Sequence, residues 1–348
     1  METVYVMEPG CYVRREGNAL NVVKKGRVID HIPAEGLKRL ILVGYLNLTG
    51  SVLDFLIHRR VETVFMTPTG RFRARLGIDE HRHVALRSAQ YRQLSDTAFA
   101  IHTARSIVIG KVRNMMRLLL LRGRQYNDLT LRSAAAGLKP IVGRVENADD
   151  LHRIRGLEGI ASRIYFQCFG RLIRNDRFTF NGRNRRPPLD PVNALLSFVY
   201  TLLTNEVNSA INACGLDPYL GALHEISYGR PSLACDLVEE YRAFLGDRLV
   251  LSLINRNMLS PDDFIFRQSG QKAYVDEEEM RAKRPVEMRP PVRRVFVAAY
   301  EQMMKRTVQY RTGQRATTYR WLILSQVRAF GEYLQDPAKG YEPFILDI

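Results

Sequence analysis

Cysteine is scarce in this sequence, and its four residues lie far apart without a CxxC pair: Cys11, Cys168, Cys214 and Cys235. This spacing excludes a cysteine-rich zinc site and disfavours a disulfide framework, so we expect buried free thiols. Long apolar runs are also missing, since the longest, Ala194–Leu203, falls short of the ~18–20 residues that span a bilayer. The first residues lack the basic and apolar segments of a signal peptide. We therefore expect a soluble, cytoplasmic protein with no membrane partner.

Several common enzyme motifs are absent as well. The sequence contains no Walker A loop, GxGxxG, HExxH or GxSxG, and no internal repeat. These absences exclude the usual nucleotide-binding, zinc-peptidase and serine-hydrolase classes.

Acidic residues are outnumbered, with 36 Asp and Glu against 52 Lys and Arg, which gives a net charge of +16. Such a surplus attracts polyanions, nucleic acid first and an acidic membrane surface second, while a merely soluble basic protein is the remaining alternative. Arginine pairs with two phosphate oxygens at once, so Arg-rich clusters favour nucleic acid. Three clusters occur: Arg105, Lys111, Arg113, Arg117, Arg122 and Arg124; Arg171, Arg174, Arg177, Arg183, Arg185 and Arg186; Arg281, Lys283, Arg284, Arg289, Arg293 and Arg294.

The 348 residues suffice for two domains, and the patterns predict an α+β fold. Residues 1–80 predict a small β-rich, β-sandwich-like domain with one helix over 50–59 and strands over 11–16, 19–24, 27–32, 39–43, 63–66 and 70–76. Residues 84–345 predict a larger all-α domain with helices over 84–124, 154–171, 191–213, 232–244, 292–307 and 319–334. Glycine, prolines and mixed charges predict a mobile loop over 268–291. Trp321 falls on an apolar helix face and is expected in the core.

Carboxylates are concentrated in the predicted helix over 232–245. Asp236, Glu239 and Glu240 are spaced to share one polar face. That face is either solvated or a site for a hard cation such as Mg²⁺ or Mn²⁺. His224 lies just upstream on a glycine-containing segment, and a histidine among carboxylates suits Mn²⁺ as well as Mg²⁺.

Glu158 is a further acidic candidate, because it lies between Gly156 and Gly159 where we expect a helix to start. Its carboxylate either interacts with the helix dipole or approaches a ligand closely. The residue patterns alone reach no further than these acidic features and one histidine.

At these residues the sequence resembles the universal CRISPR adaptation integrase, the Cas-one (Cas1) family, over nearly its whole length. The motifs that carry the resemblance are GLEG at 156–159 with Tyr165–Phe166, PVNALL at 191–196, NEV at 205–207, GLDPYLG at 215–221, LH at 223–224, RPSLACDL at 230–237, Glu239–Glu240, LSLIN at 251–255 and YEPF at 341–344.

The resemblance implies a β-rich N-terminal domain that serves in dimerisation and an α-helical catalytic domain. It implies Glu158, His224 and Glu239 as ligands of Mg²⁺ or Mn²⁺, with Asp236 as the neighbouring catalytic acid. Glu239 stands where the family often has Asp, and the adjacent Glu240 leaves the choice of ligand open. It also implies a homodimer that binds DNA, both fragment and CRISPR repeat, with a second small adaptation protein of the Cas-two type.

The expected activity is therefore metal-dependent insertion of short foreign DNA into a CRISPR array by 3′-hydroxyl attack, with nuclease activity on DNA. Arginines would contact the DNA backbone, and the candidates are Arg113, Arg117, Arg122, Arg124, Arg183, Arg185, Arg186 and Arg230. Two alternatives remain, a metal-dependent structure-specific nuclease of repair or recombination and a non-catalytic DNA-binding scaffold.

Overall fold

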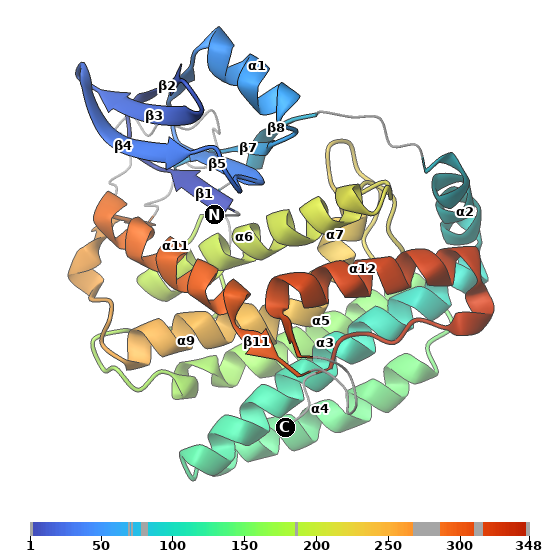
Figure 1. The fold of residues 1–348 in the computed structure, drawn as a ribbon. Helices are drawn as coiled ribbons and strands as arrows, with labels where there is room; N and C mark the ends of the chain where they lie inside the picture. Colours follow the sequence, from blue (N-terminus) through green and yellow to red (C-terminus); the bar gives the residue numbers. More distant parts are fainter. Residues whose placement is uncertain are drawn as a thin grey trace. The chain divides into compact units, whose positions relative to one another are not determined.

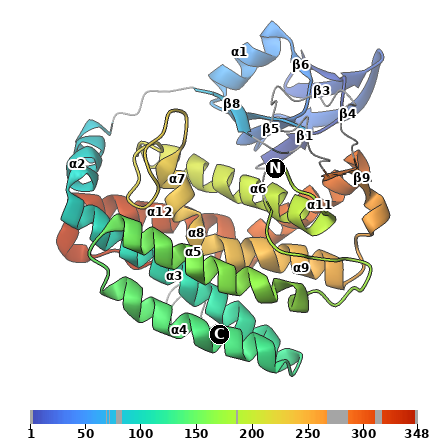
Figure 2. The same ribbon diagram turned by 180° about the vertical axis from the view of Figure 1, so that it is seen from behind.

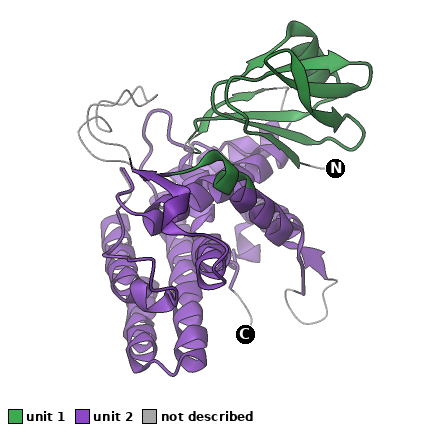
Figure 3. Ribbon diagram, turned by 90° about the vertical axis from the view of Figure 1, so that its left-hand side faces the viewer, with its two compact units in different colours: residues 1–81, 288–294 green, residues 82–287, 295–348 purple. Residues whose placement is uncertain are grey.

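The computed structural model describes residues 3–68, 70, 72–77, 83–184, 187–266, 286–309 and 316–345. The chain divides into two compact units, which Figure 3 colours separately. Unit 1 consists of Met1–His81 with Met288–Arg294, and unit 2 of Arg82–Glu287 with Val295–Ile348. Each unit is described by itself below.

Unit 1 contains two four-stranded sheets. The first has the order β1-β5-β7-β8 and is parallel except for its last pair: β1 Thr3–Val6, β5 Arg39–Val43, β7 Glu62–Met66 and β8 Phe72–Leu76. The second has the order β4-β3-β2-β6: β4 Arg27–Pro33, β3 Ala19–Lys24, β2 Tyr12–Glu16 and β6 Asn47–Leu48. Lys25 and Gly26 both have positive φ, as a tight β3–β4 hairpin turn requires.

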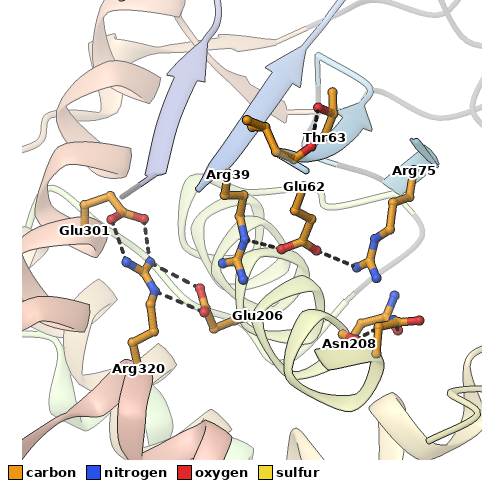
Figure 4. A network of polar contacts seen from close by, with 10 residues as sticks. Arg39, Glu62, Thr63, Arg75, Glu206, Asn208, Glu301 and Arg320 are labelled. Atoms are coloured by element: carbon orange, nitrogen blue, oxygen red, sulfur yellow. Dashed lines mark hydrogen bonds and ion pairs between the residues drawn. The ribbon is translucent and has the colours of Figure 1, made fainter. Parts of the chain in front are cut away.

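The core of unit 1 is shared by both sheets and by helix α1, Gly50–His58. Leu40 and Leu42 of β5 are buried in one cluster with Val13 of β2 and Leu20 of β3. Across β5, β7 and β8 of the first sheet, Glu62 joins Arg39 and Arg75 in ion pairs of 2.7 and 3.2 Å (Figure 4). Two sheets that share one core agree with the expected β-sandwich-like domain.

Unit 2 is built mainly of helices (Figures 1 and 2). They are α2 Val84–Ser95, α3 Thr97–Gln125, α4 Leu129–Glu146, α5 Leu151–Phe169, α6 Pro191–Ala213, α7 Ser232–Leu237, α8 Glu239–Tyr241, a π-helix Arg242–Asp247, α9 Arg248–Asn255, α11 Pro290–Lys305 and α12 Tyr319–Gln335; the first residues of α11 belong to unit 1. Short 3₁₀ turns are Gly170–Leu172, Pro261–Asp263 and Pro337–Lys339. None of the helices in the described residues is long and apolar enough to cross a bilayer.

Four of these helices begin at an aspartate. Asp96, Asp128, Asp150 and Asp190 each accept a hydrogen bond from the backbone N–H three residues on, at the starts of α3, α4, α5 and α6. This cap satisfies one of the N–H groups that a helix leaves unpaired. Asp96 therefore divides the predicted helix over 84–124 into α2 and α3.

The α+β prediction is confirmed, and several details need correction. Helix α4 was not expected, and the predicted all-α region is accompanied by two small sheets, β9 Phe264–Phe266 with β10 Val286–Met288 and β11 Thr307–Val308 with β12 Thr317–Thr318. Most of the loop predicted over 268–291 lies outside the described residues, and its last residues form β10 and the start of α11. Trp321 is half exposed, so its expected place in the core is wrong.

Candidate active site

A cavity of about 910 Å³ lies within unit 2 and gathers residues that are distant in sequence. Its walls come from α3, α5, α6, the segment before α7, and the α8 and π-helix turns. Two of the predicted acids and the predicted histidine line it: Glu158, Glu239 and His224. Most other charged lining residues are cationic: Lys111, Arg155, Arg163, Arg183, Arg230 and Arg242.

Lys111 of α3 lies between the two acids. Its ammonium group forms an ion pair and hydrogen bond with Glu158 Oε1, and its Nζ lies 2.7 Å from Glu239 Oε2. Glu239 is 3% exposed and Lys111 is 6% exposed, so both are buried. Burial alone would raise the pKa of Glu239, but Arg242 and Lys111 outweigh it and lower the pKa to about 2. The same lysine lowers the pKa of Glu158 against the opposing effect of burial. Both carboxylates are therefore ionised at neutral pH.

Arg242 holds the other oxygen of Glu239. Arg242 Nη1 lies 2.9 Å from Glu239 Oε1, and its guanidinium stacks over the ring of Tyr200. Arg183 stacks over the same ring. The guanidinium groups of two arginines thus lie over one aromatic ring in the cavity wall, and one of them, Arg242, also contacts Glu239.

His224 is oriented by Asp236, which is completely buried. Asp236 Oδ1 accepts from the His224 backbone N–H and lies 2.6 Å from His224 Nδ1, while Oδ2 accepts from the backbone N–H groups of Ala222 and Leu223. Because the carboxylate fixes Nδ1, the other ring nitrogen, Nε2, is left for a ligand. Both oxygens of Asp236 already accept hydrogen bonds from the protein, so Asp236 orients His224 and does not itself face a ligand.

Glu240 belongs to a different contact. Its carboxylate accepts hydrogen bonds from Tyr341 O–H at 2.6 Å and from the Phe344 N–H at 2.7 Å. Burial raises the pKa of Glu240 to about 7, although these two donors oppose the shift. It is absent from the cavity wall. Between the two adjacent glutamates, Glu239 is the one that reaches the cavity.

These positions correct three expectations about the acids and the helices that carry them. Asp236, Glu239 and Glu240 are all buried, and each contacts a different part of the structure. The expectation that they share one solvated helix face is therefore wrong. The expected single helix over 232–244 divides into α7, α8 and a π-helix. Glu158 lies two turns inside α5, which begins after the cap Asp150, so it is not at a helix start.

A second buried carboxylate lies at the back of the cavity. Asp247 accepts hydrogen bonds of 2.6 Å from the hydroxyl groups of Tyr165 and Tyr200. Burial raises its pKa to about 6 against the opposing effect of the two hydroxyls. Tyr200 thus connects Asp247 with the two arginines that flank its ring.

The predicted DNA-contacting arginines divide into two groups. Arg183 and Arg230 line the cavity. Arg113, Arg117, Arg122 and Arg124 lie along α3 away from it, and Arg185 and Arg186 lie outside the described residues. Arg113 is exposed and forms a 3.4 Å ion pair with Glu146.

Sequence reasoning missed Lys111, Arg242, Tyr200 and Asp247 as members of the site. Arg242 follows Glu239 by three residues, a spacing that pairs charges on a helix, and this signal was available. Nothing near Lys111 in the sequence distinguishes it from the surrounding basic residues.

A divalent cation fits the donor set of this cavity. Glu239 Oε2 is buried without a hydrogen bond, although Lys111 supplies an ion pair, and carboxylate oxygens with one imidazole suit Mg²⁺ or Mn²⁺. In their present positions, however, no three His, Cys, Asp or Glu side chains of the described residues are arranged to bind a metal ion. The ammonium of Lys111 lies between the two carboxylates instead.

The fold defines an α+β protein whose helical unit holds a cavity lined by carboxylates, lysine and arginines. Comparison with known proteins identifies its family. The family model "CRISPR associated protein Cas1" matches residues 4–283. A CRISPR-associated endonuclease Cas1 of Chlorobaculum tepidum is 34% identical over 99% of this chain and 98% of its own. A Cas1 protein from Thermotoga maritima has a TM-score of 0.80 at 25% identity, with both chains fully covered.

Two further solved structures share the fold at lower identity. One is a casposase bound to integration product, with a TM-score of 0.81, 21% identity and coverage of 100% and 96% of the two chains. The other is a Cas6-RT-Cas1–Cas2 complex, with a TM-score of 0.82 and 22% identity, where the match spans 99% of this chain and 36% of that longer chain. The chain belongs to the Cas1 family of CRISPR-associated endonucleases, and the resemblance seen in its motifs is confirmed.

Proposed function

We propose that this protein inserts short DNA fragments into a CRISPR array and cleaves DNA, and that the cavity of unit 2 is its active site. The observation that carries the proposal is the meeting of Glu158, Glu239 and His224 in one cavity lined by arginines. In this proposal Glu158, Glu239 and His224 Nε2 bind Mg²⁺ or Mn²⁺, and Asp236 keeps the imidazole in position.

The proposed reaction is transesterification. The 3′-hydroxyl of the fragment gives its proton to water as its oxygen forms a bond to phosphorus. The bond to the leaving 3′-oxygen breaks, and that oxygen takes up a proton from water. A bound divalent ion lowers the pKa of the attacking hydroxyl and offsets phosphate charge. Arg183, Arg230 and Arg242 line the same cavity and provide donors to the phosphate oxygens. Water in place of the hydroxyl gives hydrolysis, so one site supports both activities.

The proposal includes three binding partners: DNA, a second copy of this chain and a small protein of the Cas-two type. The net charge of +16 supports DNA binding. The solved structures with the same fold include a Cas6-RT-Cas1–Cas2 complex and a casposase bound to integration product, which supports a Cas2-type protein and DNA as partners here. Dimerisation through unit 1 and a cytoplasmic location stay predictions from the sequence.

The test compares His224→Ala with His152→Ala, an exposed histidine of α5 outside the cavity. Labelled fragment, a supercoiled repeat plasmid, Mn²⁺ and the partner protein are combined, and joined and cleaved products are measured. We expect His224→Ala to lose both activities at least ~100-fold, because the variant removes a proposed metal ligand and leaves Asp236 with no imidazole to orient. His152→Ala should keep both. A gel shift and circular dichroism should show unchanged DNA binding and fold.

Each alternative function has its own outcome in this assay. Undiminished joining by folded His224→Ala would contradict the site. Cleavage without joining by the wild type, with the partner present, would favour a plain nuclease. DNA binding without any metal-dependent product would favour a scaffold.

A further inference from the structure

Lys111 occupies an unusual position for a lysine in a long basic helix. Its side chain is 7% exposed, and its ammonium contacts one carboxylate from α5 and another from α8. Three chain segments therefore meet on a single charge. Without that charge, Arg242 at the other oxygen of Glu239 would be, among the described residues, the remaining ion-pair partner of the two carboxylates in a largely buried site.

The same place is the one that a metal ion would need. Oε1 of Glu158 and Oε2 of Glu239 both contact the same ammonium nitrogen of Lys111, so that nitrogen lies where a metal shared by the two carboxylates would lie. Arg242 occupies Oε1 of Glu239, so Oε2 is the oxygen left for a metal on that side chain. A divalent ion and an ammonium group repel each other at contact distance, so both cannot lie between these oxygens.

We propose that Lys111 is a built-in stand-in for the metal, which keeps Glu158 and Glu239 together before a divalent ion binds and is displaced into the cavity when it does. The inference rests on the proposed metal site. The cavity of about 910 Å³, which Lys111 itself lines, gives the displaced side chain room. Lys111 is therefore a positioning residue, and metal affinity in the wild type is reduced by the work of moving it.

The chain offers a matched control for a cation between two carboxylates. Arg320 of α12 forms ion pairs of 3.0 Å with Glu206 and 2.9 Å with Glu301, as Figure 4 shows, and none of the three lines the cavity. Replacing Lys111 or Arg320 by methionine removes the positive charge that two carboxylates share at that position. Only at Lys111 should Mn²⁺ replace the missing charge.

The experiment measures Mn²⁺ binding and melting temperature for wild type, Lys111→Met, Arg320→Met and His224→Ala, without DNA. We expect Lys111→Met to melt lower in EDTA, to bind Mn²⁺ at least ~10-fold more tightly than wild type, and to regain its melting temperature with Mn²⁺. Arg320→Met should also melt lower but gain no more from Mn²⁺ than wild type. A Lys111→Met protein that binds Mn²⁺ no more tightly than wild type would overturn the inference.

A second measurement uses the wild type alone and does not depend on whether Lys111→Met folds. Amine acetylation is followed by mass spectrometry with and without Mn²⁺. Labelling of Lys111 should rise several-fold with Mn²⁺, because its ammonium leaves the carboxylates, while the exposed Lys139 should label equally in both conditions. Unchanged Lys111 labelling at saturating Mn²⁺ would contradict displacement.

The two proposals fail in different ways. If His224→Ala loses Mn²⁺ binding but neither Lys111 result appears, the metal site stands and the stand-in role of Lys111 is wrong. If neither wild type nor Lys111→Met binds Mn²⁺, the proposed metal site is wrong and the inference is overturned with it.

Discussion

Asp236 accepts four hydrogen bonds while completely buried, and this makes it the residue through which His224 is held. In Asp236→Asn, the amide NH₂ replaces one carboxylate oxygen and meets donors in either orientation. They are the N–H groups of Ala222 and Leu223 on one side, and the backbone N–H and Nδ1 of His224 on the other. We expect a loss of about 3 kcal/mol in the free energy of unfolding and a ~10–100-fold loss of joining activity. Urea unfolding and the plasmid assay measure these effects. Asp262→Asn, at an exposed surface ion pair, should change neither.

At the residue scale the sequence indicated His224, Glu239 and Glu158, because histidine and carboxylates in a basic chain stand out. It could not assign Asp236 to the support of His224, since that role depends on backbone N–H groups that only the folded loop presents. Lys111 was indistinguishable within its basic cluster. Its burial depends on α3 meeting α5 and α8, contacts that no local pattern encodes.

At the scale of elements, α3 packs closely against the segment after α12. An added Cβ on Gly110 would lie 2.6 Å from Pro343 Cβ, whereas Gly137 of α4 has open space. We expect Gly110→Ala to lose about 1–3 kcal/mol in the free energy of unfolding through overpacking. Gly137→Ala should gain about 0.5–1 kcal/mol, because alanine favours helix. Denaturant melts of both variants measure the contrast, and equal effects would contradict the close contact.

The contact between α8 and the same segment should make stability depend on pH. The pKa of Glu240 is about 7 in the folded state against 4.5 unfolded, so the folded protein keeps a proton that the unfolded chain releases. Stability from this group is therefore full below pH 4.5 and lost as the pH rises to 7, by about 3 kcal/mol in all.

Glu240→Gln cannot titrate, so it isolates this contribution. Unfolding free energies of wild type minus Glu240→Gln should fall by about 3 kcal/mol from pH 4 to pH 8. Glu332→Gln, at an exposed ion pair with Lys339, should leave the pH profile unchanged. A flat difference for Glu240→Gln would mean that this carboxyl titrates normally.

Most elements followed from local patterns, and the exceptions have physical causes. Six strands of unit 1 were predicted to within two residues at each end, because alternation and two-residue turns determine them, whereas β1 and β6 were not expected. Helix α4 was overlooked, although Leu131, Leu138, Ile141 and Val145 have helical spacing, because it contains Pro140. The π-helix Arg242–Asp247 was not predictable, because the 3.6-residue spacing of apolar residues does not indicate where a turn contains an extra residue.

For the whole molecule, the charge of +16 predicts DNA binding that weakens steeply with salt. Each phosphate contact releases counterions. The slope of log affinity against log salt concentration therefore becomes steeper by about 0.9 for each phosphate that the protein contacts. Neutralising the exposed Arg113 and Arg124 as a Gln pair should lower the slope by about 2. Filter binding on two unrelated sequences measures this, and both should weaken alike. A slope near zero for wild type would contradict backbone binding.

The hydrogen bonds of Glu240 also determine when, during synthesis, this part of the protein can fold, because its partners lie near residue 341 and beyond. Glu240 and Tyr341 are separated by 101 residues, and Phe344 lies further along still. During synthesis the ribosome therefore delivers the partners of Glu240 long after Glu239 itself. Until they emerge, the residue adjoining Glu239 is an unpaired carboxylate that favours water over burial. An unfinished chain thus lacks the contacts that hold Glu240 beside Glu239. If Glu239 acts as proposed, we expect no DNA cleavage from a chain whose synthesis has not passed Phe344.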